Sequence, residues 1–424
     1  MSPARLCASI LLVTASFGCT RAPARFLYVA NFGSDDISVY TVDSASGVLG
    51  AVRGSPFAAG RGPRAVAVAP SRRFAYVVNH GSSDVSVYRI DAKSGRLTPV
   101  AGSPFASGDA PRDVVVTPSG RYLYVVCAGP RRYDQTVGSI AAYAIHSETG
   151  ALSPLVGSPM PAMGSPSAVA MTPSGNVLFV TSGFAIAAYT ADGATGALTP
   201  VPGSPFSTGT RDFVVDGPRS PLTGESLGPP VTLNIPYLVN SLAVAPSGHV
   251  VYAAVSAILV PPPGAVSVGG LAPPLPRAPS GPAGPRLVSA VSAFWIDAAS
   301  GALTPIAGAP WPSGTNALAV TSARNGRFVY VANYTSRDIW GYSVDATGEL
   351  RPLSGSPFQL EKPPSIVLAE PSGFLYVTHG AGSTNGAGVV AAYAIDPATG
   401  ALIPVRGGPF PAGSKPSALA ITPR

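Results

Sequence analysis

PRAVAVAPSRRFAYVVNHGSSDVSVYRIDAKSGRLTPVAGSPF, from Pro63 to Phe105, is the clearest copy of a motif that the chain writes seven times. The ends of the seven copies are separated by six distances along the chain. Five of these distances are 46 to 55 residues, and one is 105 residues. Self-similarity at this period indicates a solenoid, a propeller or an array. The copies end in Gly-Ser-Pro-Phe or a variant of it, which begins at Gly54, Gly102, Gly157, Gly203, Gly308, Gly355 and Gly407.

Each copy contains four short runs of apolar or alternating residues, separated by turn residues. In the clearest copy the runs cover 65–69, 74–79, 85–91 and 97–101, and Val, Ile, Tyr and Phe dominate them. These residue types suit a pleated, packed sheet, whereas the Gly, Ser, Pro and Asp between them suit turns. Four antiparallel strands per repeat are typical of a β-propeller blade. The sequence therefore predicts an all-β chain that forms a seven-bladed β-propeller of four-stranded antiparallel blades.

Two further columns of the repeat give the same number of blades. A tyrosine, or once a phenylalanine, recurs in the second run at Tyr28, Tyr76, Tyr124, Phe179, Tyr252, Tyr330 and Tyr376. A Gly-x-Leu pattern precedes the fourth run at Gly47, Gly95, Gly150, Gly196, Gly301, Gly348 and Gly400.

The two ends of the repeat region complement each other. The first copy begins at its second strand, 26–31, and the chain ends with an additional first strand, 417–422. We expect both ends to share one blade, because this pairing removes an open sheet edge and closes the ring.

Composition favours a single repetitive domain over several separate ones. Gly and Pro are frequent, at 48 and 47 of 424 residues, which matches the many turns, and only 11% of residues are charged. The net charge of +7 comes from scattered arginines without a basic run that contains aromatics, which argues against nucleic-acid binding. We expect a monomer that needs no cofactor.

Residues 1–19 differ from the rest of the chain. Arg5 precedes an apolar stretch, 6–17, that is too short for a membrane span and predicts a bacterial secretory signal. The following Gly18-Cys19 favours a lipoprotein site with Cys19 lipidated, and cleavage near Ser16 without a lipid is the alternative. We expect an exported protein in the cell envelope, or in the periplasm or medium, that contacts a membrane only through that lipid. Residues 20–24 would be a linker, and 25–424 the propeller.

Two insertions, 207–239 and 257–287, interrupt the fifth copy. In an up-and-down blade, the loop that enters the first strand and the loop between strands two and three open on the same face, here called the top face. Both insertions should rise from it. Long loops on a rigid scaffold are usually functional or disordered, so we hypothesise a lid or side wall over the central channel.

The residue at the top of each innermost strand should line the channel mouth. Arg64 and Arg112 fall on adjacent blades, where two guanidinium groups suit a carboxylate or phosphate. The alternative is a structural arginine that pairs with Asp109, Asp113 or a loop carbonyl. The seven predicted substrate-binding residues are Arg64, Arg112, Ser167, Asn240, Asn316, Ser365 and Ser417.

Two histidines are expected near this mouth, His379 at the end of a second strand and His80 just after one. A neutral imidazole there could act as general base on a water molecule, and a turn histidine is the alternative. The sequence contains no metalloprotease, nucleophile-elbow, P-loop or zinc motif, so no metal site is expected. Cys127 is expected to be a small buried hydrophobic residue.

SRRFAYVVNHGSSDVSVYRID (71–91), NGRFVYVANYTSRDIWGYSVD (325–345) and SGRYLYVV (119–126) closely resemble the repeats of the lactonase-family seven-bladed propellers, which carry YVTN-type repeats. The resemblance spans about residues 25–424. It implies the fold and, through the 6-phosphogluconolactonase-like members, hydrolysis of a sugar lactone without an obligatory metal. Enzymatic relatives often carry a His-rich segment at the start of a first strand, where this chain has Pro63-Arg64 and Pro111-Arg112.

Two functions follow as hypotheses. In the first, water attacks a lactone carbonyl in the top-face mouth, Arg64 and Arg112 bind the substrate, and His379 or His80 activates the water. In the second, the chain is a non-catalytic exported propeller that binds a protein, peptide or glycan of the envelope, because fold alone does not determine function.

Overall fold

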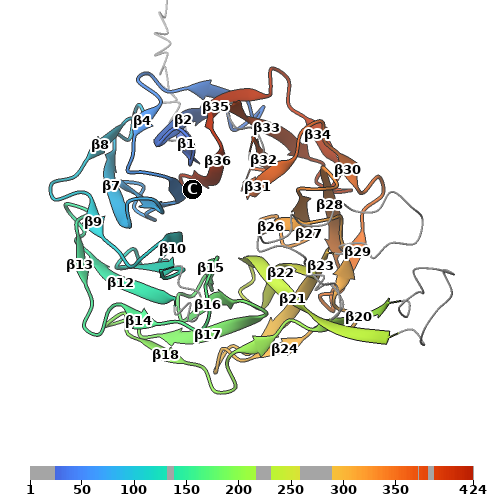
Figure 1. The fold of residues 1–424 in the computed structure, drawn as a ribbon. Helices are drawn as coiled ribbons and strands as arrows, with labels where there is room; N and C mark the ends of the chain where they lie inside the picture. Colours follow the sequence, from blue (N-terminus) through green and yellow to red (C-terminus); the bar gives the residue numbers. More distant parts are fainter. Residues whose placement is uncertain are drawn as a thin grey trace, which may run out of the picture.

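The computed structural model of the chain describes residues 24–130, 138–215, 231–257, 289–370, 372–380 and 386–423, with the backbone alone at 211–215 and 231–235. The described residues form seven antiparallel sheets arranged as blades around a central channel (Figure 1). The predicted seven-bladed propeller is therefore confirmed. We number the blades along the chain, so blade 1 contains β1 and blade 7 contains β32.

Two strands of each blade lie nearest the axis. The innermost strands, beginning with that of blade 1, are β36 (Pro416–Ile421), β5 (Pro63–Val68), β10 (Pro111–Val116), β15 (Val169–Met171), β21 (Val231–Val244), β26 (Ala317–Ser322) and β31 (Pro364–Glu370). The second strands are β1 (Arg25–Asn31), β6 (Phe74–Asn79), β11 (Tyr122–Cys127), β16 (Val177–Ser182), β22 (Val250–Ala257), β27 (Phe328–Asn333) and β32 (Phe374–His379).

The outer half of each blade consists of a full strand and a divided one. The third strands are β2 (Asp36–Val42), β7 (Asp84–Ile90), β12 (Ser139–Ile145), β17 (Ala185–Ala191), β23 (Ser289–Ile296), β28 (Asp338–Val344) and β33 (Ala387–Ile395). The first pieces of the fourth strands are β3 (Leu49–Ala51), β8 (Leu97–Pro99), β13 (Leu152–Pro154), β18 (Leu198–Pro200), β24 (Leu303–Pro305), β29 (Leu350–Pro352) and β34 (Leu402–Pro404). Their second pieces are β4 (Phe57–Ala58), β9 (Phe105–Ala106), β14 (Met160–Pro161), β19 (Phe206–Ser207), β25 (Trp311–Pro312), β30 (Phe358–Gln359) and β35 (Phe410–Ser414).

The Gly-Ser-Pro-Phe motif fills the break in the outer strand. In blade 2, β8 and β9 both pair with β7, and the motif lies between them. The Ser103 hydroxyl accepts a hydrogen bond from the Val87 backbone N–H of β7 at 2.9 Å. Serine does the same in blades 1, 3, 4 and 6, at 2.8 to 3.1 Å. The motif therefore recurs because it satisfies a backbone donor that the divided strand leaves without a partner.

The tyrosine and glycine columns meet between blades. The Tyr124 hydroxyl of blade 3 donates to the Gly196 carbonyl of blade 4 at 2.8 Å, and Tyr330 of blade 6 donates to Gly400 of blade 7 at 2.7 Å. Gly150 has a φ of +77°, and a Cβ there would lie 2.4 Å from the Phe74 ring. Only glycine combines this backbone conformation with so close an approach. The two repeat columns are thus the two sides of one inter-blade contact.

The two ends of the chain close the ring in blade 1, as predicted. Strand β36 pairs with β1, with Tyr28 opposite Ala420. Just after β36, the Thr422 side chain accepts a hydrogen bond from the Phe26 N–H at 3.0 Å. Arg25 also forms an ion pair with Glu370 of blade 7, and both side chains are buried. The closing blade is therefore bonded both within its own sheet and to its neighbour.

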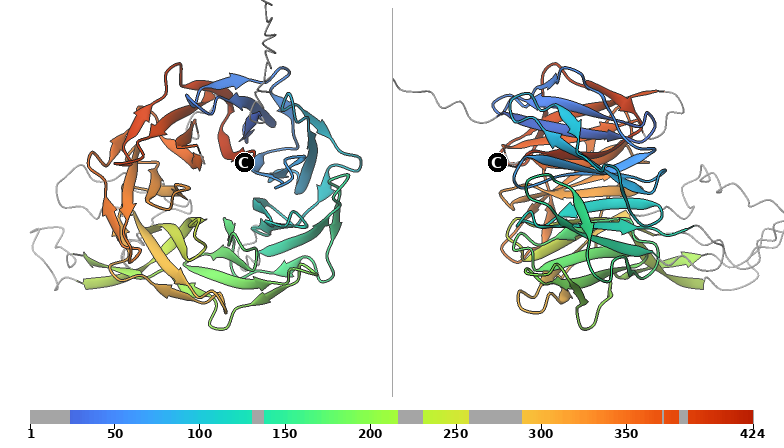
Figure 2. Two further views of the ribbon diagram at one scale, coloured as in Figure 1. Left: turned by 180° about the vertical axis from the view of Figure 1, so that it is seen from behind. Right: turned by 90° about the vertical axis from the view of Figure 1, so that its left-hand side faces the viewer.

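The first insertion extends the fifth blade. Strand β20 (Thr210–Val215) pairs with the first part of β21, from Val231 to Pro236, as a two-stranded ribbon. The ribbon lies at the rim of the ring (Figure 1) and projects from one face in the edge-on view (Figure 2). Its described residues lie beside the channel and do not cover it. Residues 258–288, which contain nearly all of the second insertion, lie outside the described residues.

Candidate functional site

A β-bulge marks the top of the innermost strand in most blades. In blade 2, Pro63 lies opposite Asn79 and Ala65 opposite Val78, so Arg64 is left without a partner in the ladder. Such bulges bend the strand and redirect a side chain, and they are common beside active sites. In blades 1, 3 and 5 the same shift leaves Ser417, Arg112 and Asn240 between paired residues.

The register of blade 6 differs from the one that the sequence predicts. Ala317 lies opposite Asn333 and Ala319 opposite Ala332, which places Leu318 at the bulge. Asn316 lies two residues earlier, in the loop before β26, with a φ of +63°. The assignment of Asn316 to the ring is wrong, because its Asn-x-Leu-Ala-Val resembles that of blade 5 but is two residues out of register. The ring is Arg64, Arg112, Ser167, Asn240, Leu318, Ser365 and Ser417.

Three polar members of this ring have partners in the next blade. The Ser417 hydroxyl donates to the Pro63 carbonyl at 2.8 Å, and the Asn240 amide donates to the Ala317 carbonyl at 2.7 Å. Ser167 donates to the Val239 carbonyl at 3.4 Å. Each bond joins neighbouring innermost strands. These three side chains thus connect blades at the mouth, whatever else they do.

Ser365 of blade 7 is different. Its hydroxyl oxygen is buried and has no hydrogen-bond partner among the described residues. Unpaired buried polar groups are rare, so this hydroxyl is either a cost to the fold or a contact for something that enters the mouth.

Arg64 also differs from the other ring members. Its side chain is only partly exposed, and it forms no hydrogen bond or ion pair within the described part of the chain. Burial lowers the pKa of the guanidinium, and the charge of Asp113 on the next blade opposes that shift. Arg112 occupies the same ring position on blade 3 and is also partly exposed. A partly desolvated, unpaired guanidinium beside a second arginine suits an anionic or strongly polar ligand.

Asp113 follows Arg112 on β10, and the backbone fixes its carboxylate. One oxygen accepts from the N–H of Val114 at 2.8 Å, and the other accepts from the N–H of Val169, on β15 of blade 4, at 2.9 Å. Burial raises the pKa of Asp113 to about 6, against the lowering effects of these two N–H groups and of Arg64. The side chain is nevertheless partly exposed. The sequence indicated Asp113 only as a partner for an arginine. The sequence feature that could have identified it is its charge, because the residue that follows the ring residue is small or apolar in the other copies of the repeat.

The two predicted histidines lie in different parts of the ring. His80 Nδ1 is 3.3 Å from the carbonyl oxygen of Pro111, the residue before Arg112. His379 Nδ1 is 3.0 Å from the Lys362 carbonyl, in blade 7. A carbonyl can only accept, so in a neutral ring Nδ1 carries the proton and Nε2 is an acceptor.

Of the two predicted histidines, His80 is therefore the one beside the arginines. Blades 2 and 3 bring together His80, Arg64, Arg112 and Asp113, whereas blade 1 separates blade 7 from blade 2 (Figure 1). His379 is buried, and burial lowers its pKa, so its ring is neutral at physiological pH.

The remaining chemistry-bearing groups do not form a site. Burial raises the pKa of the Cys127 thiol to about 11, which fits the predicted buried residue and not a nucleophile. Within the described ranges no group of three or more His, Cys, Asp or Glu side chains could hold a metal ion. In the same ranges, no helix is long and apolar enough to span a membrane. Cys19 lies outside the described residues.

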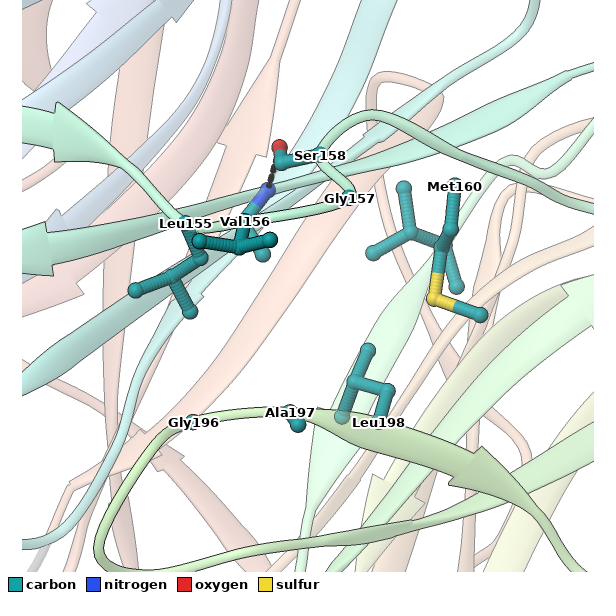
Figure 3. A pocket seen from close by; sticks show the side chains of 10 residues that line it. Leu155, Val156, Gly157, Ser158, Met160, Gly196, Ala197 and Leu198 are labelled. Atoms are coloured by element: carbon teal, nitrogen blue, oxygen red, sulfur yellow. Dashed lines mark hydrogen bonds between the residues drawn. The ribbon is translucent and has the colours of Figure 1, made fainter.

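A pocket of about 200 Å³ lies on the outer wall between blades 3 and 4 (Figure 3). Leu155, Val156, Met160 and Leu198 line it, and the Ser158 hydroxyl at its edge is occupied by the Ala142 N–H at 2.8 Å. An apolar pocket without a titratable side chain does not suit hydrolysis of a polar substrate. The channel mouth at blades 2 and 3 is therefore the candidate site.

Comparison with known proteins agrees with this architecture. Residues 19–215 and 287–421 match the family model described as "Lactonase, 7-bladed beta-propeller". Among solved structures, a putative 6-phosphogluconolactonase from Bacteroides uniformis is similar, with a TM-score of 0.62 at 15% identity over 94% of this chain and 99% of that one. A periplasmic gluconolactonase from Pseudomonas aeruginosa has a TM-score of 0.59 at 20% identity, with 94% and 99% covered.

A second Bacteroides protein, a putative 6-phosphogluconolactonase from Bacteroides fragilis, has a TM-score of 0.60 at 17% identity over 95% of this chain and 99% of that one. No curated protein matches the sequence. At these identities the solved structures support the fold, whereas the family match covers more than half of the chain. The chain belongs to the lactonase family of seven-bladed β-propellers.

Proposed function

We propose that this propeller hydrolyses a sugar lactone at the top-face channel mouth formed by blades 2 and 3. The observation that carries the proposal is the guanidinium of Arg64, which is partly buried and has no partner among the described residues, next to Arg112. Membership of the lactonase family supports the reaction class. Two solved structures of the same fold are named as a putative 6-phosphogluconolactonase and a gluconolactonase, which supports the substrate class.

The reaction adds water across the ring ester. A water oxygen attacks the lactone carbonyl carbon, and negative charge develops on the carbonyl oxygen. Arg64 and Arg112 stabilise that charge, or hold a phosphate or carboxylate on the substrate. His80 Nε2 takes the proton of the attacking water and returns it to the ring oxygen when the acyl C–O bond breaks. The product is the open-chain hydroxy acid. Of the two predicted histidines we assign the role to His80, since it lies beside Arg112 through Pro111.

We also propose that the protein is exported. The apolar segment 6–17 supports export, and one relative of the same fold is named as periplasmic. A lipid on Cys19 is the finer proposal. Metabolic labelling with a fatty-acid analogue tests it: label on the wild-type chain and none on Cys19→Ala is the expected result. An unlabelled mature chain that begins near residue 17 would support cleavage without a lipid.

A lactone screen tests the activity. Purified protein is assayed by pH indicator against D-glucono-δ-lactone and its 6-phosphate, with spontaneous hydrolysis subtracted. We expect the double variant Arg64→Ala/Arg112→Ala to lose at least ~100-fold in kcat/KM, because removing one preorganised stabilising donor costs about that factor. The control Arg96→Ala/Arg406→Ala removes two exposed charges and should leave the rate unchanged.

Two results would contradict the proposal. Full activity in the double arginine variant would place the reaction elsewhere. A wild-type protein that hydrolyses no lactone would favour the non-catalytic alternative, a propeller that binds a protein, peptide or glycan.

A further inference from the structure

The position that follows the ring residue on each innermost strand is small or apolar in every blade except one. In blade 3 it carries a carboxylate. The seven residues at this position, from blade 1 onward, are Ala418, Ala65, Asp113, Ala168, Ser241, Ala319 and Ile366.

Blade 5 shows what this position does for the fold. The Ser241 hydroxyl accepts a hydrogen bond from the Val320 N–H on the innermost strand of blade 6, at 3.4 Å. Asp113 makes the same inter-blade contact with Val169 of blade 4. A hydroxyl is therefore sufficient for the structural contact. The alanines at this position in blades 1, 2, 4 and 6 show that neighbouring blades pack together without the contact. The charge of Asp113 exceeds what the fold requires.

The charge also has a cost. A carboxylate that is mostly withdrawn from water is destabilised, as the raised pKa of Asp113 shows. Such a residue suggests a function when geometry points the same way. The charge that acts on its pKa is that of Arg64 from β5. Arg112 precedes it on its own strand, and Cys127 and His80 both lie beside Pro111, two residues before it. Strand β15 contributes a backbone N–H.

The carboxylate has acceptor capacity left. Each ionised oxygen can accept two hydrogen bonds, and each accepts only one from the backbone here. Part of the side chain is exposed, and the arginines beside it can only donate. The two arginines thus offer hydrogen-bond donors for a carbonyl or an anion, and the Asp113 carboxylate offers a hydrogen-bond acceptor. Neighbouring hydroxyl groups on a sugar ring donate hydrogen bonds, whereas an unsubstituted lactone ring has nothing to donate.

We infer that Asp113 is the specificity-determining residue of the mouth: its carboxylate accepts hydrogen bonds from the ring hydroxyls of a polyhydroxylated lactone, while Arg64 and Arg112 bind the carbonyl or an acidic substituent. This inference rests on the proposed lactone hydrolysis. It adds the residue that would distinguish a hydroxylated lactone ring from an unsubstituted one, because a buried acceptor left unpaired by the unsubstituted ring disfavours binding of that ring.

The test compares two lactones with the same six-membered ring, D-glucono-δ-lactone and δ-valerolactone, the second of which lacks hydroxyl groups. The kcat/KM of each is measured for the wild-type protein and for Asp113→Ser, which keeps a hydroxyl as in blade 5. We expect the wild-type protein to prefer gluconolactone. We expect Asp113→Ser to reduce the ratio of the two kcat/KM values by ~10-fold or more, mainly through a higher KM for gluconolactone.

Ser241→Ala provides the matched control, since it removes the equivalent inter-blade hydrogen bond far from Arg64. It should leave the ratio at the wild-type value, and thermal unfolding shows whether both variants are folded. Asp113→Asn, which keeps the shape without the charge, gives a second reading of the same ratio if the serine variant does not fold.

The outcomes separate the two ideas. An unchanged ratio in a folded, active Asp113 variant overturns the inference and leaves lactone hydrolysis standing, as does a wild-type protein without preference for gluconolactone. A wild-type protein that hydrolyses neither lactone overturns both.

Discussion

Asp113 and Arg64, on the innermost strands of adjacent blades, influence each other's protonation without forming an ion pair in the described structure. The positive charge of Arg64 lowers the pKa of Asp113 against the stronger effect of burial, and Asp113 raises the pKa of Arg64 in the same way. Neither group neutralises the other by direct contact. Both charges therefore remain available to a ligand in the channel mouth.

The raised pKa of Asp113 predicts how stability depends on pH. Below about pH 4 the carboxyl is protonated in both the folded and the unfolded chain, and burial costs nothing. Between pH 4 and pH 6 the folded chain binds more protons than the unfolded one, so stability falls as pH rises, by up to about 3 kcal/mol. Urea unfolding at pH 4 and pH 7 should show Asp113→Ser gaining stability relative to the wild type across this window. A pH-independent difference between the two proteins would contradict the pKa.

The two histidines should respond differently to substitution. His379→Asn introduces the residue found at the same place in β1, β6 and β27, and we expect lactone hydrolysis within twofold of the wild type. His80→Phe copies Phe32 of blade 1, and we expect a loss of ~100-fold or more in kcat, in the range of general-base catalysis. Loss of activity in the His379 variant alone would move the base to blade 7.

Glycine at the inter-blade contact should be irreplaceable for a steric reason. Gly150→Ala places a methyl group 2.4 Å from the Phe74 ring at a φ of +77°. We expect a loss of about 3 kcal/mol in unfolding free energy, from overpacking together with the backbone conformation. Gly157→Ala is the control, because its φ is +80° and its Cβ would meet nothing within 4 Å. It should cost about 1 kcal/mol. Equal losses would show that the contact with Phe74 relaxes freely.

The serine of the divided outer strand should contribute modestly in each blade. Ser103→Ala removes the acceptor for the Val87 N–H, and we expect a loss of about 1 kcal/mol in unfolding free energy. Blade 5 has Ala309 at this position, so Ala309→Ser offers the reverse change. It should leave stability unchanged or raise it. Destabilisation by the added serine would show that β23, the third strand of blade 5, has no free N–H donor at this place.

The ion pair at the closing blade should matter more than one on the surface. Glu370→Gln removes the carboxylate charge that pairs with the buried Arg25, and we expect a loss of about 3 kcal/mol or more in unfolding free energy. Glu148→Gln breaks the exposed pair with Arg73 and should leave the Tm nearly unchanged. Similar Tm values for both variants would mean that the closure depends on β36 alone.

The fold could be predicted because the repeat encodes contacts that every blade needs. Tyr124 and Gly196 recur as columns since blades 2, 3, 6 and 7 each place a tyrosine hydroxyl against the glycine carbonyl of the next blade. The closure followed from counting strands at the two ends. The first insertion was expected as a lid or side wall, and its described part is a rim extension, because β20 and β21 continue the sheet of blade 5.

The site was harder to predict, since register and burial are not visible in a single copy. Asn316 was misplaced because blades 5 and 6 share the pattern Asn-x-Leu-Ala-Val, but this pattern begins two residues earlier relative to the strand pairing in blade 6. Only the pairing of β26 with β27 reveals this difference. The proposed role of Asp113 in specificity depends on the comparison with Ser241. That comparison requires the hydrogen bond that each side chain forms with the next blade, which the sequence does not reveal.

The pairing of β36 with β1 has a consequence for synthesis of the chain. Of the described strands, β36 is the last to be synthesised, yet it is the innermost strand of the blade that contains β1, the first of them. During translation six blades can assemble before β36 is made. Until then one edge of β1 is unpaired, because its partner lies more than 380 residues downstream, as the bond between Phe26 and Thr422 shows. Closure of the ring therefore has to wait until β36 has been synthesised, and a premature stop before Pro416 would release an unclosed ring with the edge of β1 exposed.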